Sequence, residues 1–232
     1  MPFLLIDKPA GITSHDVVDV VRKITGERTV GHAGTLDPFA TGLLIVGVGR
    51  ESTKHLNEFL GMGKTYEAII RIGESSTTGD PEGEIVLVGG ANVTAEAIDS
   101  AMTSLTGDLL QIPPMHSAIK IGGQKLYELA RKGIEIDRPA RPVTISRFDL
   151  APTYPLFPTP YSLPFDLHVI IDCSSGTYIR AIARDLGEKL GTAGYLTQLR
   201  RTAIGPHGID HATPLHEITK ENWVSLAKKL VA

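Results

Sequence analysis

The segment from Gly31 to Gly42 sets one carboxylate in a loop rich in glycine, with Asp37 directly before Pro38. Proline fixes its own φ, lacks an N–H donor and biases the preceding residue toward extended backbone. Such a placement can project the Asp37 carboxylate into a cleft, where it is available for catalysis. An ordinary Asp-Pro turn is the alternative that the spacing leaves open.

A second group of polar residues, Tyr178 and Arg180, falls where a strand turns into a helix after Cys173. An arginine in the first turn of a helix is poorly placed, because the helix dipole favours carboxylates there. A partner anion would explain Arg180, either a carboxylate such as Asp37 or a phosphate. A solvated arginine on a surface helix is the other reading.

Several familiar cofactor motifs are incomplete in this chain. Glu58 stands where a phosphate-binding loop ending in Gly63-Lys64-Thr65 needs glycine, and Ser52 replaces the third glycine of a dinucleotide fingerprint. The histidines near the C-terminus are read as surface residues, and a single cysteine excludes a Cys-based zinc finger. We therefore expect no cofactor and no metal.

The net charge of −3 argues against a protein that coats nucleic acid indiscriminately. Residues 111–147 nevertheless carry seven basic against three acidic side chains. A local basic segment on a mildly acidic protein suggests a polyanion held at one place. Two ordinary solvated faces explain the charge pattern equally well.

The elements that must position these residues mix strands and helices without regular βαβ alternation, so the chain is predicted to be α+β with a mixed, mostly antiparallel sheet flanked by helices. Predicted strands cover residues 3–6, 43–48, 66–72, 85–88, 117–121, 143–150, 165–172 and 194–204. Predicted helices cover residues 14–25, 52–60, 95–105, 124–132, 178–190 and 220–231. Residues 28–42, 74–84 and the Pro-rich 151–164 are predicted to be loops.

The 232 residues are 42% hydrophobic and 21% charged, which is typical of globular proteins. We expect one catalytic domain over residues 1–232 with a basic insertion at about 111–142. The apolar runs are too short for a signal peptide or a membrane span. A cytoplasmic monomer is the expectation.

Seven motifs in order along nearly the whole chain resemble the bacterial TruB-type tRNA pseudouridine synthases, which isomerise uridine 55 in the T arm of tRNA. The motifs are Asp7–Ser14, Gly31–Gly42, Lys64–Tyr66, Gln111–Lys120, Leu126–Arg131, Gly176–Arg180 and Leu199–Arg201. Each alone is modest evidence, and their common order makes the resemblance specific.

The resemblance implies that Asp37 is the essential aspartate and that Arg180 pairs with it. The reaction breaks N1–C1′, turns the uracil and joins C5 to C1′, which needs neither a redox cofactor nor a metal. The carboxylate could attack the sugar or the base, or act through proton transfer. Pairing with Arg180 would keep Asp37 ionised in a dry site.

The family flips its target base out of the stack, at a cost of a few kcal/mol that the pocket must offset. By resemblance, Tyr66 stacks on the base, His32 fills the vacated space, and Tyr178 and Leu199 line the pocket. Tyr66 and Leu199 could also be plain core residues. The loop around Asp80 resembles one near the active site.

The basic insertion resembles the part of the family that grips the RNA stem, so the expected partner is the tRNA T-arm stem-loop, without guide RNA. Many members continue into a small RNA-binding domain called PUA, which the roughly 30 residues after Arg201 are too few to form. A non-catalytic RNA-binding or tRNA-folding protein is the alternative. A dyskerin-like protein is disfavoured by the missing PUA domain.

Overall fold

The computed structural model describes residues 1–90, 92–152 and 161–230. The chain divides into two compact units. The terminal unit contains Met1–Glu67 and Leu199–Ala232, and the middle unit contains Ala68–Gln198. Two strands, β4 (Lys64–Ile72) and β12 (Gly194–Ile204), begin in one unit and end in the other. The expected single catalytic domain stays a prediction.

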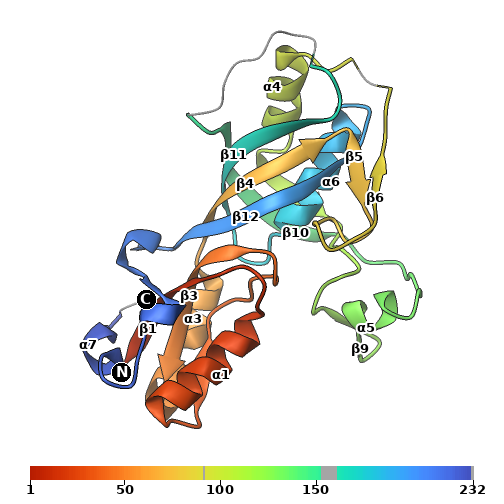
Figure 1. Cartoon of the computed structure of the whole chain (residues 1–232). Helices are drawn as coiled ribbons and strands as arrows, with labels where there is room; N and C mark the ends of the chain where they lie inside the picture. The colour runs from red at the N-terminus through yellow and green to blue at the C-terminus, as the bar shows by residue number, and fades with distance from the viewer. Residues whose placement is uncertain (91, 153–160, 231–232) are drawn as a thin grey trace. The chain divides into compact units, whose positions relative to one another are not determined.

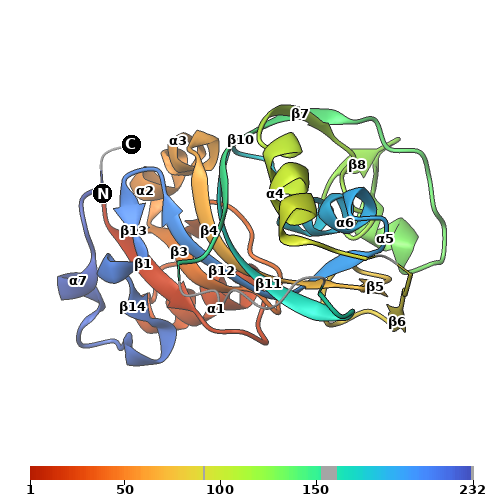
Figure 2. The same cartoon turned by 90° about the horizontal axis from the view of Figure 1, so that it is seen from above.

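The sheet of the terminal unit has the strand order β14-β1-β3-β12 (Figures 1 and 2, with β14 labelled in Figure 2). Strands β1 and β3 pair antiparallel over their whole shared length, whereas β14 joins β1 and β12 joins β3 in parallel. Two short strands, β2 and β13, pair with β3 and β12. The bounds are β1 Phe3–Lys8, β2 Val30–His32, β3 Thr41–Val48, β13 His207–Gly208 and β14 Thr213–Pro214.

Helix α1 (Ser14–Thr25) packs its apolar face on this sheet, as its sequence predicts. Thr13 and Asp16 form a capping box at its start, and Gly26 ends it at a φ of 74°. Valines at 17, 18 and 21 are buried against β1 and β3. This packing attaches α1 to the sheet.

The remaining short elements of the terminal unit differ in part from prediction. The predicted helix 52–60 is two helices, α2 (Arg50–Lys54) and α3 (Leu56–Gly61). The predicted helix 220–231 is wrong for most of its length, because α7 covers only Trp223–Leu226 and Lys228 pairs with the backbone of Phe3 instead; its last residue lies outside the described part of the chain. Two 3-10 turns, Ile209–His211 and Leu215–Glu217, precede α7.

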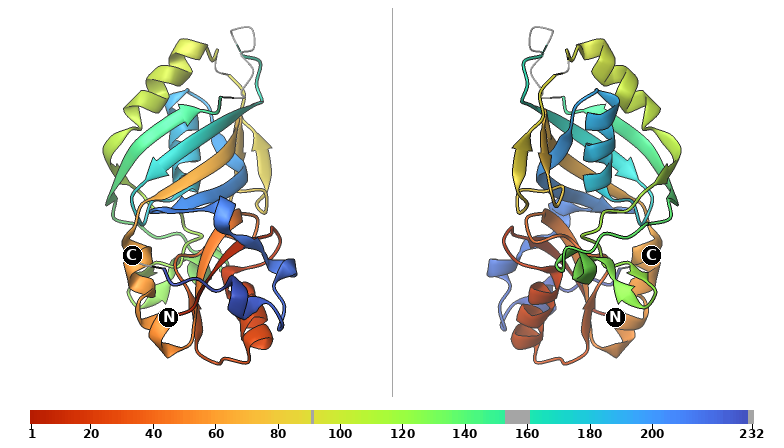
Figure 3. Two further views of the ribbon diagram at one scale, coloured as in Figure 1. Left: turned by 90° about the vertical axis from the view of Figure 1, so that its left-hand side faces the viewer. Right: turned by 90° about the vertical axis from the view of Figure 1, so that its right-hand side faces the viewer.

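The middle unit has the strand order β12-β4-β11-β10-β7. Strands β11 (Phe165–Cys173), β10 (Arg141–Leu150) and β7 (Gly107–Gln111) are successive antiparallel neighbours. Helices α4 (Ala95–Ser104) and α6 (Ile179–Lys189) lie side by side on one face of these strands (Figures 2 and 3). Buried residues of both helices face the sheet, so this unit is one sheet layer covered by one helix layer.

Two small hairpins complete the middle unit. The first joins β5 (Glu74–Ser76) to β6 (Ile85–Leu87). The second joins β8 (Lys120–Ile121) to β9 (Gln124–Lys125) and leads into α5 (Leu126–Ala130). The sequence predicts a strand at 117–121 and a helix at 124–132, and both are shorter here.

The α+β class with a mixed, mostly antiparallel sheet is confirmed. The loop prediction is wrong for residues 30–32, 41–42 and 74–76, which form β2, the start of β3, and β5, and β7 was not predicted. In the strand predicted at 66–72, Glu67 is exposed and the other residues are buried or partly buried. Most of the Pro-rich segment, 153–160, lies outside the described residues.

Candidate active site

The loop that carries Asp37 lies in the terminal unit between β2 and β3. Glycines at both of its ends take positive φ, 97° at Gly34 and 105° at Gly42. The C=O of Asp37 accepts a hydrogen bond from the N–H of Ala40 at 3.1 Å, which closes a tight turn over Pro38. Both readings of the Asp-Pro pair, a turn and a presented carboxylate, are compatible with this geometry.

Ser14 holds the residue that precedes Asp37. Its Oγ accepts from the N–H of Leu36 at 2.8 Å and donates to the C=O of Leu36 at 3.1 Å. Ser14 is buried at the first position of α1. One hydroxyl therefore satisfies both backbone groups of Leu36 where water has no access.

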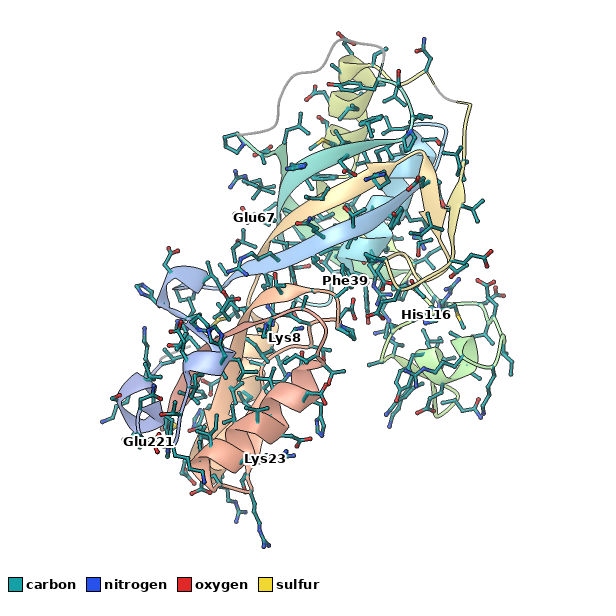
Figure 4. All side chains as sticks on the ribbon, in the orientation of Figure 1. Lys8, Lys23, Phe39, Glu67, His116 and Glu221 are labelled. Carbon is teal, nitrogen blue, oxygen red and sulfur yellow. The ribbon has the colours of Figure 1, made fainter. Side chains whose placement is uncertain are left out.

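Lys8, which is labelled in Figure 4, binds the carbonyl of Pro38, the residue that follows Asp37. It is fully buried at the end of β1, and its Nζ donates to the carbonyls of Pro9 at 2.8 Å, Ile12 at 2.7 Å and Pro38 at 3.4 Å. Burial lowers the pKa of Lys8 to about 8, against the opposing negative charge of Asp37. The Lys8 amine thus stays mostly protonated near pH 7, and its charge interacts with that of Asp37.

Arg201, which lies on β12, binds the N-terminal half of the Asp37 loop. It is 1% exposed, and its guanidinium donates to the carbonyls of Leu43 at 2.8 Å, Gly34 at 3.1 Å and Thr35 at 3.4 Å. Its backbone pairs with Gly42, where a Cβ would collide with the carbonyl of Arg201. Glycine is therefore required at 42 by both φ and space.

Three of the other predicted residues also lie in the terminal unit. His32 ends β2, and burial, Arg201 and His15 together lower its pKa, so its imidazole is neutral near pH 7. Tyr66 on β4 and Leu199 on β12 are each 8% exposed. Their burial is what a core residue or a pocket wall would show, so their roles stay predictions.

The start of β4 is fixed by a buried lysine. Lys64 donates from Nζ to the carbonyls of Leu60 at 2.7 Å and Met62 at 2.5 Å, and so caps the C-terminal end of α3. It stands two residues before Tyr66. These bonds explain why a lysine stands at position 64 without assigning it to a phosphate-binding loop.

Arg180 lies in the middle unit, in the first turn of α6, and is 6% exposed. Its Nη1 lies 3.4 Å from the Oδ2 of Asp80 and donates to the C=O of Thr78 at 2.8 Å, while Nη2 donates to the C=O of His116 at 2.6 Å. Asp80 is itself buried and accepts from the hydroxyl of Thr78. The anion expected beside Arg180 within this unit is thus Asp80, which sequence reasoning placed only loosely.

Tyr178 is the residue at which α6 begins, and it is partly exposed. The sequence-predicted site residues therefore divide between the two units: His32, Asp37, Tyr66 and Leu199 in one, Tyr178 and Arg180 in the other. The pairing of Asp37 with Arg180 stays a prediction.

A groove of about 530 Å³ lies between α4 and β10 of the middle unit, and it contains none of the predicted site residues. In the described part of the chain, no group of three His, Cys, Asp or Glu side chains is arranged to hold a metal ion. None of the helices among the described residues is long and apolar enough to cross a bilayer.

Sequence reasoning missed the residues that hold the Asp37 loop. Lys8 was seen only as a member of a motif, Arg201 only as one of two adjacent arginines, and Ser14 was not linked to Leu36. The residue types could have revealed them. A lysine at the end of an apolar strand, or an arginine within a strand, needs polar partners for its charge if it is buried.

Comparison with known proteins identifies the family of this chain. Residues 22–179 match the TruB family pseudouridylate synthase N-terminal domain, and residues 180–230 match the tRNA pseudouridylate synthase B C-terminal domain. Two similar curated proteins are the tRNA pseudouridine synthases B of Arthrobacter sp. (strain FB24) and Mycobacterium tuberculosis (strain ATCC 25618 / H37Rv). The Arthrobacter protein is 49% identical to this chain, over 94% of this chain and 70% of its own length. The Mycobacterium tuberculosis protein is 47% identical, over 97% of this chain and 74% of its own length.

Solved structures show the same fold at lower identity. A Cbf5-Nop10-Gar1 complex superposes with a TM-score of 0.72 at 24% identity, and an H/ACA RNP bound to a substrate RNA with a TM-score of 0.65 at 23% identity. The first match covers 98% of this chain and 59% of the solved chain, and the second covers 93% of this chain and 51% of the solved chain. The matched domains and the identity to curated relatives decide the family: the chain belongs to the TruB family of pseudouridylate synthases and is an isomerase.

Proposed function

We propose that this protein converts uridine 55 in the T arm of tRNA to pseudouridine, with Asp37 as its catalytic residue. The curated relatives are tRNA pseudouridine synthases B. The observation that carries the assignment to Asp37 is its fixed backbone: buried Arg201, Ser14 and Lys8 bind the carbonyls of residues 34, 35, 36 and 38 around it. Because the backbone on both sides of Asp37 is held in place, little backbone entropy is lost when its carboxylate reaches a reactive geometry.

The reaction is balanced without any co-reactant. The N1–C1′ bond breaks, the uracil turns, C5 bonds to C1′, and the proton released from C5 is balanced by one taken up at N1. Asp37 acts either as a nucleophile at the sugar or the base, or as a proton carrier. Both roles need the ionised carboxylate, which the adjacent Lys8 ammonium favours.

The other predicted residues complete the pocket. Arg180 pairs with Asp37, Tyr66 stacks on the flipped uracil, His32 fills the vacated space, and Tyr178 and Leu199 line the walls. A neutral His32 suits insertion among stacked bases, because no charge has to be desolvated there.

The basic segment at residues 111–142 holds the RNA stem. The Lys125 ammonium and the Arg131 guanidinium lie 5.3 Å and 5.5 Å from the centre of the Tyr127 ring, so one ring orders two cations. Leu126 and Leu129 of the intervening helix α5 are buried. The segment thus presents prearranged cations to a phosphate backbone.

The test compares wild-type protein with Asp37→Asn on a T-arm stem-loop, with pseudouridine located by nucleoside mass mapping. Asp99→Asn on exposed α4 is the matched control and should leave the yield unchanged. We expect product at position 55 from wild type and none from Asp37→Asn. Product from both removes Asp37 from its role, and product from neither favours the RNA-binding alternative.

A further inference from the structure

Gln111 is a polar residue that is buried in a strand whose apolar neighbour is exposed. It closes β7, where the apolar Leu110 is 75% exposed while Gln111 is only 5% exposed. An edge strand that turns its leucine to solvent and buries its amide breaks the ordinary pattern, and such exceptions concentrate at functional positions. The buried amide must have a specific partner.

That partner is the backbone of one residue, Tyr178. The Oε1 of Gln111 accepts from the N–H of Tyr178 at 2.8 Å, and its Nε2 donates to the C=O of Tyr178 at 3.1 Å. A primary amide is the side-chain group that offers a donor and an acceptor side by side at this spacing. Gln111 therefore pairs with Tyr178 as a neighbouring strand would.

The pairing fixes the beginning of α6. Tyr178 is the N-cap of this helix, and its C=O also accepts from the N–H groups of Ala181 and Ile182. The side chain of Tyr178 makes no capping hydrogen bond to the first turn of α6. Since Arg180 follows two residues later, the orientation of its guanidinium depends on where Tyr178 is held.

Gln111 is also the base of the basic segment. Its backbone pairs with Arg141, so the two ends of residues 111–141 meet there. Further contacts join the same segment to α6: the C=O of Ile112 accepts from Arg184, and the C=O of His116 accepts from Arg180. Of these contacts, only the Gln111 pairing uses a side chain of the segment.

We propose that Gln111 is a positioning residue that ties the base of the basic segment to Tyr178, so that RNA bound by the segment holds Arg180 in its working orientation. The proposal rests on the proposed function, because it concerns the same site. It predicts that loss of the Gln111 amide slows the reaction while the cations that bind RNA remain in place.

The test uses Gln111→Met, which keeps the length of the side chain and removes both bonds, with Gln198→Met at an exposed position as control. We expect kcat to fall by about ten- to a hundredfold with KM within about threefold, since small displacements of a catalytic group have costs of this size. A kcat within twofold of wild type overturns the proposal, as does a rise in KM alone.

Hydrogen exchange separates this proposal from a failure of the proposed function. Without RNA, the amide of Tyr178 should exchange faster in Gln111→Met than in wild type. With the T-arm stem-loop bound, residues 178–182 should gain protection in wild type but not in the variant, at equal occupancy. Equal protection in both proteins overturns the coupling, whether or not pseudouridine is formed.

If Gln111→Met does not fold, Gln111→Glu replaces it and is measured at a pH where its carboxylate is ionised, because it then keeps the acceptor for the Tyr178 N–H but sets a negative charge against the Tyr178 C=O in place of the donor. The kcat of this variant should then lie below that of wild type while the Tyr178 amide stays protected. Wild-type kcat in Gln111→Glu overturns the proposal.

Discussion

The Oγ of Ser14 bonds both the N–H and the C=O of Leu36, at 2.8 Å and 3.1 Å. The two residues are 22 positions apart in the chain, and Leu36 directly precedes Asp37. One hydroxyl thus links the start of α1 to the backbone of the proposed catalytic residue.

Ser14→Ala should lower both stability and rate. Two buried backbone groups of Leu36 lose their partner, which costs roughly 2 to 4 kcal/mol if no water replaces the hydroxyl. Urea unfolding measures the loss, and Ser100→Ala on exposed α4 gives the background. The rate per folded molecule should also fall; an unchanged rate would show that Leu36 does not orient Asp37.

Gly42→Ala should be among the most destabilising alanine substitutions in the terminal unit. Its φ of 105° is unfavourable for alanine, and the new Cβ collides with the backbone of Arg201. We expect a loss of about 3 kcal/mol or more, seen as a lower Tm. Gly208→Ala, where a Cβ meets nothing within 4 Å, should change Tm little. Equal losses at both glycines would contradict the close approach of β3 and β12.

The local parts of the fold could be predicted from sequence. Thr13 and Gly26 delimit α1 because caps are chosen by neighbouring residues, and the strand at 194–204 has the predicted bounds. Pairing between distant segments could not be read this way. Val30–His32 becomes a strand only because β3 offers its edge, and Lys228 leaves the predicted helix because Phe3 offers backbone partners.

The candidate site shows the same limit. Asp37 could be singled out by its proline and glycines, and Arg180 by its unfavourable place at a helix start. The side chains that hold them could not, because Arg201 is 167 positions from Gly34 and Gln111 is 67 from Tyr178. Hydrogen bonds over such separations follow from the tertiary fold, not from local spacing.

The buried Lys8 should give stability a specific dependence on pH. Its pKa is lowered from 10.5 to about 8, so between these values the unfolded chain holds a proton that the folded protein has released. Stability relative to Lys8→Met should therefore rise with pH across this window, by roughly 3 kcal/mol in total. Urea unfolding from pH 7 to pH 10 measures it, with Lys23→Met on the exposed side of α1 as control. A difference that is flat with pH would mean that Lys8 keeps its ordinary pKa.

The cations gathered on Tyr127 should determine the salt dependence of RNA binding. Lys125→Ala and Arg131→Ala each remove one charge that the proposed function places on a phosphate. Each should weaken binding of the T-arm stem-loop and reduce the slope of log K against log salt by about 0.7 to 0.9. Tyr127→Leu removes the ring but neither charge, so it should weaken binding while leaving the slope near that of wild type. Titrations at several salt concentrations distinguish the cases: a slope unchanged in Lys125→Ala and Arg131→Ala would mean that these side chains do not contact phosphates.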